Sequence, residues 1–117
     1  MKKILVIMFM VLLLTGCSKE LESSKVSCKQ KDDLVSNGAV IIDVRSKEEY
    51  EDYHLEGAIN IPYTEIATKI KEYSNITKDT KIVVYCKSGV RSGKAFETLK
   101  SEGYLKVYDL GSINSCL

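Results

Sequence analysis

The sequence has few of the residues on which metal and nucleic-acid sites depend. Its 117 residues include no Trp, one Pro and one His, and 17 Lys and Arg nearly balance 16 Asp and Glu. A single His excludes a zinc site with two Cys and two His ligands. The near-neutral charge gives no electrostatic argument for a nucleic-acid partner. Four Cys remain, and we expect any chemistry to depend on one of them.

The N-terminal segment has the layout of a secretory signal. Lys2 and Lys3 precede an unbroken apolar run, Ile4 to Leu14. A helix of that length measures about 17 Å, well short of a hydrocarbon core of about 30 Å. A lasting transmembrane anchor is therefore not expected. The chain without this segment is long enough for one small α/β domain and too short for two.

Leu14-Thr15-Gly16-Cys17 resembles the bacterial lipobox, in which the cysteine is lipidated and becomes the mature N-terminus. The resemblance implies removal of residues 1–16, a lipidated Cys17 with a polar tether over 17–25, and a folded domain over 26–117. It also implies a protein anchored in the membrane by its lipid, on the extracytoplasmic side of a bacterial cell envelope. The alternative is a plain signal peptide that happens to precede a Cys.

The rest of the chain alternates between strand and helix patterns. Apolar, β-branched runs at 39–44, 81–85 and 106–110 predict buried strands, and helices are predicted at 27–36, 47–53, 64–73 and 92–102. Ser27 with Gln30 three residues later predicts a capping box, and Ser46 is expected to cap the next helix. This alternation predicts an α/β domain with a mainly parallel sheet.

The loop Cys86-Lys87-Ser88-Gly89-Val90-Arg91 lies between a predicted strand and a predicted helix. Ligand sites in open α/β sheets form at that edge. Backbone N–H groups of such a loop, together with the helix dipole, can stabilise an anion or a thiolate. We therefore expect Cys86 to be a nucleophile, with Gly89 allowing the tight turn and with Lys87 and Arg91 attracting an anionic substrate. The alternative is a buried structural Cys beside solvated cations.

This loop resembles the active-site loop of single-domain rhodaneses, which are sulfurtransferases. The resemblance extends to Ile42-Asp43-Val44-Arg45, Glu49-Tyr50, His54 to Pro62, Gly103-Tyr104 and Val107 to Gly111. It implies a five-stranded, mainly parallel sheet with helices on both faces. It also implies a monomer that needs no metal or organic cofactor.

The resemblance implies that Cys86 takes a sulfane sulfur from a small anionic donor such as thiosulfate and passes it to a thiol or another thiophilic acceptor. The persulfide and the donor would be bound by Lys87, Ser88, Gly89, Val90 and Arg91. Asp43 and Arg45 are interpreted as structural groups near the site. His54 matches a structural hydrogen-bonding residue of the family and is not assigned to the catalytic set.

Three other functions are weighed against sulfur transfer. A rhodanese-like domain can be a catalytically idle binding module, although such domains often lack the Cys. The extra cysteines also fit a thiol-redox protein of the envelope. Phosphatase or arsenate-reductase chemistry fits least, because those enzymes have five residues between Cys and Arg, whereas four separate Cys86 from Arg91.

The sequence departs from the family pattern at two places. Tyr53 stands where a Gly is usual, and Cys116 occupies the position of a Trp in a shortened C-terminus. In the family's sheet the first short strand lies beside the last, so a Cys28–Cys116 disulfide is geometrically feasible in an oxidising compartment. The alternative that we favour is that both are small, buried, unbonded side chains.

Overall fold

A computed structural model describes residues 24–117. The predicted signal segment, Cys17 and nearly all of the tether lie outside these residues. The elements, in chain order, are α2 (Cys28–Ser36), β1 (Val40–Asp43), α3 (Lys47–Asp52), β2 (Ile59–Asn60), η1 (Tyr63–Glu65), α4 (Ile66–Lys69), η2 (Ile70–Glu72), β3 (Lys81–Cys86), α5 (Val90–Ser101), β4 (Lys106–Ser112) and η3 (Ile113–Cys116). No helix within the described residues has the length and apolar character needed to cross a membrane.

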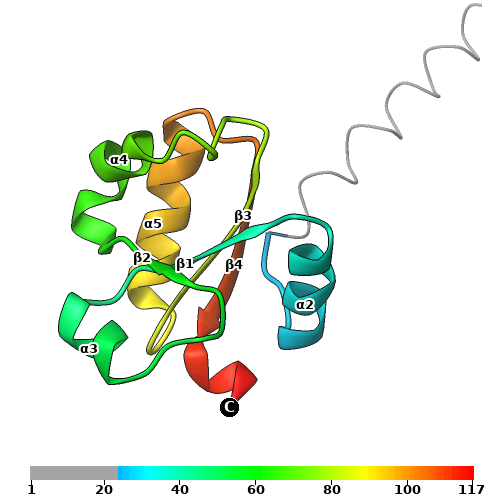
Figure 1. Cartoon of the computed structure of the whole chain (residues 1–117), viewed down its shortest axis with the longest axis vertical. Helices are drawn as coiled ribbons and strands as arrows, with labels where there is room; N and C mark the ends of the chain where they lie inside the picture. The colour runs from blue at the N-terminus through cyan, green and yellow to red at the C-terminus, as the bar shows by residue number, and fades with distance from the viewer. Residues whose placement is uncertain (1–23) are drawn as a thin grey trace, which may run out of the picture.

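The strands form one parallel sheet in the order β2-β1-β3-β4 (Figure 1). The prediction of five strands is wrong for the described residues. The segment that precedes α2 contributes only an isolated bridge, between Lys25 and Asp109. The physical reason is local, because Ser27 caps α2 two residues after that bridge and ends the extended segment there.

Helices cover both faces of the sheet, as predicted. On one face, α4 and α5 pack Ile66 and Leu99 against alternate residues of the central strands. On the other face, Leu34 of α2 and Ile113 of η3 pack against the remaining alternate residues, among them Val83. Figure 1 shows α4 and α5 on the side of the sheet opposite α2. Since each central strand is covered twice, its sequence is apolar throughout rather than alternating.

The predicted helix starts follow the capping residues. Ser27 and Gln30 form the expected capping box, and Ser46 forms a second one with Glu49. The helix predicted over 64–73 is divided into η1, α4 and η2. The last predicted helix begins earlier than expected, at Val90, because Gly89 occupies its N-cap.

Cys28 and Cys116 are joined by a disulfide, so the favoured expectation of two unbonded, buried thiols is wrong. Their Cα atoms lie 5.3 Å apart, and both side chains are only half-buried. The pairing of the Lys25 segment with β4 brings the start of α2 beside the C-terminal end of the chain. The bridge therefore joins α2 to η3 on one face of the sheet.

Candidate active site

The C-terminal end of β3 places Cys86 at the start of a tight loop. The Cys86 side chain is fully buried and is the one free cysteine among the described residues. The backbone N–H of Gly89 donates to the Cys86 Sγ atom at 2.9 Å. Gly89 has a φ of 100°, in the left-handed region that favours glycine. The loop thus turns back so that a main-chain donor faces the sulfur.

The first turn of α5 fixes the second half of this loop. The Ser92 hydroxyl donates to the Gly89 carbonyl oxygen at 3.1 Å, and the Gly93 N–H donates to the same oxygen at 3.1 Å. The helix has 12 residues, and its N-cap, Gly89, lies three residues after Cys86. Its dipole therefore places positive potential on the side of the loop that holds the sulfur.

Arg91 is held by a residue that the sequence prediction did not assign to the site. Its Nη1 and Nη2 atoms donate to the two carboxylate oxygens of Glu49, at 2.6 and 3.1 Å. The hydrogen bond from Arg91 lowers the pKa of Glu49 to about 2, and the same contact raises the pKa of Arg91. A smaller Coulombic effect of the nearby Cys86 side chain also raises the Arg91 pKa.

The other predicted binding residues line the outer side of the loop. Lys87 and Ser88 are exposed, and Val90 is 63% exposed. Within the described residues, the structure gives none of these three side chains a hydrogen bond or an ion pair. They are accessible to a molecule that approaches Cys86 from solvent, whereas the Arg91 guanidinium is already occupied by a carboxylate.

Asp43 and Arg45 form a buried ion pair at the C-terminal end of β1. Asp43 is fully buried and Arg45 is 2% exposed, and an Arg45 Nη2 atom lies 2.8 Å from an Asp43 oxygen. The Tyr85 hydroxyl donates to the same carboxylate at 2.9 Å and accepts the Leu55 N–H at 3.0 Å. Burial raises the pKa of Tyr85. The network fixes the strand end that lies beside the residue preceding Cys86.

Tyr53 and His54 are both accommodated without a catalytic contact. Tyr53 has a φ of −166°, extended backbone that any residue adopts, so the usual Gly is not needed. Its carbonyl oxygen accepts from Arg45 at 2.7 Å. The His54 ring stacks on Tyr50, with ring centroids 3.8 Å apart, and its Nδ1 atom lies 2.8 Å from the Tyr50 carbonyl oxygen. These contacts hold the His54 ring against Tyr50 of α3.

Sequence reasoning did not identify two side chains that contact the Cys86 loop, Glu49 and Ser112. Glu49 was recognisable from its place three residues after Ser46, but a capping box gives no information about a partner on α5. Ser112 donates from its hydroxyl to the Lys87 carbonyl oxygen at 2.6 Å. No sequence signal marks that contact, because it depends on the register of β3 and β4.

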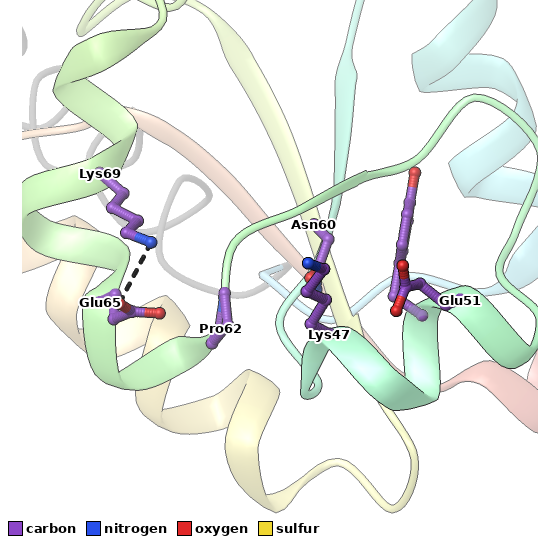
Figure 2. A pocket seen from close by; sticks show the side chains of 7 residues that line it. Lys47, Glu51, Asn60, Pro62, Glu65 and Lys69 are labelled. Carbon is purple, nitrogen blue, oxygen red and sulfur yellow. Dashed lines mark ion pairs between the residues drawn. The ribbon is translucent and has the colours of Figure 1, made fainter.

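A surface cavity of about 390 Å³ lies between α3 and α4 (Figure 2). Its lining residues are Lys47, Tyr50, Glu51, Asn60, Pro62, Glu65 and Lys69. Lys69 and Glu65 form an ion pair at 3.2 Å across its edge. None of the loop residues 86–91 lines it. Among residues 24–117, no group of three or more His, Cys, Asp or Glu side chains could hold a metal ion.

The family model described as "Rhodanese-like domain" matches residues 27–115. The thiosulfate sulfurtransferase PspE of Escherichia coli is 42% identical over 72 residues, which are 62% of this chain and 68% of that protein. The protein YqhL of Bacillus subtilis is 39% identical over 72 residues, 62% of this chain and 55% of that protein. The chain thus matches little more than half the length of YqhL.

Two solved structures share the fold. A rhodanese with anions from E. coli superposes with a TM-score of 0.62 and 38% identity, covering 66% of this chain and 89% of the other. The human single-domain sulfurtransferase TSTD1 has a TM-score of 0.72 and 24% identity, with coverage of 80% and 95%. The fold, the Cys86 loop and these matches together show that the chain belongs to the family of rhodanese-like domains.

Proposed function

We propose that this rhodanese-type sulfurtransferase moves a sulfane sulfur from an anionic donor such as thiosulfate to a thiophilic acceptor, through a persulfide on Cys86. The observation that carries the proposal is the Gly89 N–H that donates to the Cys86 Sγ atom at 2.9 Å. A sulfur held by a main-chain donor at a helix N-terminus is stabilised as a thiolate, the form that attacks. The name of the PspE relative supports thiosulfate as a donor.

The first half-reaction makes the persulfide. The Cys86 thiolate attacks the outer sulfur of thiosulfate, the sulfur–sulfur bond of the donor breaks, and sulfite leaves with the bonding electron pair. Cys86 then carries one extra sulfur with a negative charge. Backbone N–H groups of residues 87–91 and the α5 dipole are the groups available to stabilise that charge. Lys87, which is exposed at the mouth of the loop, attracts the donor dianion.

The second half-reaction returns the enzyme to its starting state. A thiolate or another nucleophile attacks the outer sulfur of the persulfide, and the Cys86 thiolate leaves with the electron pair of the broken sulfur–sulfur bond. No proton acceptor is needed when both nucleophiles react as anions. His54 therefore has no role in this scheme, and its ring stacks on Tyr50. Arg91, bound by Glu49, shapes the loop in this scheme.

We further propose that the protein acts at the bacterial cell envelope, anchored on the extracytoplasmic side by a lipid on Cys17. The lipobox-like sequence that ends at Cys17 supports this. The Cys28–Cys116 disulfide supports it too, because disulfides persist in oxidising compartments.

Intact-mass measurement after treatment with thiosulfate tests the proposed chemistry. The purified protein should gain one sulfur atom, fragment masses should place it on Cys86, and cyanide should remove it as thiocyanate. Cys86→Ser should remain folded and gain none. A folded wild-type protein that gains no sulfur and forms no thiocyanate would favour an idle binding module. Efficient hydrolysis of an aryl phosphate by the wild type would favour the phosphatase alternative.

A further inference from the structure

Ser112 connects the active-site loop to the C-terminal end of the chain. It is the last residue of β4, and its backbone is paired in register with Cys86 of β3. Its hydroxyl donates to the Lys87 carbonyl oxygen at 2.6 Å. The Ser112 hydroxyl oxygen also accepts the Asn114 N–H at 3.1 Å and so caps η3. One side chain therefore holds both the loop and the short helix that follows β4.

The contact fixes the orientation of the peptide group between Lys87 and Ser88. In a planar trans peptide the carbonyl oxygen and the following N–H point in opposite directions. With its oxygen bound to Ser112, the peptide between Lys87 and Ser88 keeps the Ser88 N–H turned away from Ser112. The hydrogen bond thus limits which way one of the loop's donors can point. The Lys87 side chain itself is exposed and gives the loop no other anchor at this point.

The segment from Ser112 to Cys116 is anchored at its C-terminal end by the disulfide. Cys116 ends η3 and is bonded to Cys28, the first residue of α2. Ile113, which follows Ser112, is fully buried in the apolar cluster against which Leu34 of α2 packs. A covalent and apolar anchor therefore lies within four residues of the hydroxyl that contacts the loop. The loop between β3 and α5 and the segment that follows β4 lie at the same end of the sheet (Figure 1).

We propose that Ser112 is a positioning residue for the Cys86 loop, and that the Cys28–Cys116 disulfide acts on the site by holding Ser112 in place. The proposal rests on the proposed sulfur transfer at Cys86. Ser112 orients the peptide between Lys87 and Ser88 so that the Ser88 N–H remains available to the charged outer sulfur of the persulfide. The disulfide keeps η3 from moving away and taking the hydroxyl with it.

A purely structural role predicts a different result from a positioning role. The Lys87 carbonyl lies at an exposed part of the loop, where water can replace a lost donor at little cost in stability. Loss of the hydroxyl also removes the cap of η3, which costs some stability in either case. The rate of the folded enzyme is therefore the readout that separates the two roles, because it falls if Ser112 positions the loop and stays intact if Ser112 is only structural.

The first experiment compares Ser112→Ala with Ser112→Thr and with Ser115→Ala in the full-length protein. We expect Ser112→Ala to lower kcat with thiosulfate and cyanide by about three- to tenfold, with KM nearly unchanged. The rate of Cys86 alkylation by iodoacetamide at pH 7 should fall in parallel. Ser112→Thr keeps a hydroxyl and should restore most of both rates. Ser115 is exposed on η3, and its variant should behave as wild type.

The second experiment tests the disulfide by substitution, because a thiol reductant would also act as a sulfur acceptor. Cys28→Ser/Cys116→Ser, measured well below its melting temperature, should lower kcat in the same way as Ser112→Ala. The triple variant with Ser112→Ala should lose no more activity than Ser112→Ala alone, since both changes release the same contact. Losses that multiply would show that the disulfide acts independently of Ser112 and would overturn the coupling.

Failure of the inference is distinguishable from failure of the proposed function. If wild type and Ser112→Ala turn over equally and are alkylated equally fast, Ser112 does not position the loop, although sulfur transfer stands. If the wild type shows no sulfur transfer, the proposed function is wrong, and the alkylation rates still decide whether Ser112 acts on Cys86. Loss of activity in Ser112→Ala without rescue by Ser112→Thr would also contradict the hydrogen bond as the cause.

Discussion

The guanidinium of Arg91 and the carboxylate of Glu49 form a two-point ion pair that joins the first turn of α5 to α3. The shortest contact is 2.6 Å, and the two side chains are 29% and 31% exposed. The sequence alone suggests an Arg91 free to attract an anionic donor. The carboxylate instead contacts both terminal nitrogens of the guanidinium and ties the loop that follows Cys86 to a second helix. Such charge-assisted, bidentate contacts are stronger than neutral hydrogen bonds.

Glu49→Gln separates the two roles that Arg91 can have. If the ion pair shapes the loop, the substitution weakens it, and kcat/KM with thiosulfate should fall about three- to tenfold without a lower KM. Arg91→Ala should cause at least as large a loss, and the double variant should be no worse than Arg91→Ala. A lower KM in Glu49→Gln would instead mean that a freed Arg91 binds the donor directly.

The same carboxylate gives a pH dependence of stability. Its pKa is lowered to about 2 in the folded state, mainly by the hydrogen bond from Arg91, from an ordinary value of 4.5. Its contribution to the free energy of unfolding is therefore fully present above about pH 4.5 and is lost as the pH falls toward 2. Urea unfolding at pH 5 and pH 3 should show a smaller loss for Glu49→Gln than for wild type.

Glu48→Gln is the matched control for that measurement. Glu48 lies in the same first turn of α3 and is exposed, so both substitutions remove one carboxylate near the helix N-terminus. The wild type and Glu48→Gln should lose similar stability between the two pH values. Equal losses in all three proteins would show that the ion pair with Arg91 does not carry the effect.

Tyr85→Phe should destabilise the domain through a buried N–H. The Tyr85 hydroxyl accepts the Leu55 N–H at 3.0 Å and donates to Asp43, which keeps its bonds from Arg45. Removing the hydroxyl leaves the Leu55 N–H without an acceptor, at a cost of about 1–3 kcal/mol. Urea unfolding at pH 7 measures this cost.

Tyr108→Phe is the control for the loss of a hydroxyl, because the structure gives the half-buried Tyr108 no side-chain hydrogen bond among the described residues. Its free energy of unfolding should stay within about 0.5 kcal/mol of wild type. A Tyr85→Phe protein that is equally stable would show that water or a local shift satisfies the Leu55 N–H.

Local features of the fold could be predicted from the sequence, and features that depend on distant contacts could not. Capping by Ser27 and Ser46 and the turn at Gly89 are set within a few residues, and the structure has all three. The apolar strands were visible because burial on both faces removes any alternation. The division of the helix after Pro62 depends on how packing competes with local preference.

The side chains that hold the Cys86 loop in shape also depend on contacts between residues far apart in the sequence. Glu49 lies 42 residues before Arg91, and Lys87 lies 25 residues before Ser112. Glu49 and Ser112 are ordinary polar residues in the sequence. Their contacts form only because the fold brings α3 and the end of β4 beside the loop. The nucleophile could be inferred, since a strand, a Cys, a Gly and a helix follow one another in sequence. The groups that hold the loop in shape required the tertiary structure.

The Cys28–Cys116 disulfide predicts a thiol count. After denaturation without reductant, a maleimide should label Cys86 and neither Cys28 nor Cys116, because both are bonded to each other. Labelling of all three would show that the bridge is absent. The bridge spans 88 residues, so the chain-entropy model assigns it about 4–5 kcal/mol. Cys28→Ser/Cys116→Ser should lose stability of that order in urea unfolding.

Cys17→Ala should release the protein from membranes. Several acyl chains on one residue hold a protein firmly in a bilayer, where a single chain gives marginal binding. The remaining positive start and short apolar run would still direct export, but no lipid would be attached and the signal segment would not be removed at this position.

Partition of cell extracts into a Triton-type detergent, with intact-mass measurement of the recovered protein, gives the comparison. Ser18→Ala, a neighbouring change that keeps the Cys, should remain in the detergent phase. A wild-type protein found entirely in the aqueous phase would contradict lipidation, and the proposed sulfur transfer would stand because it rests on residues 86–91.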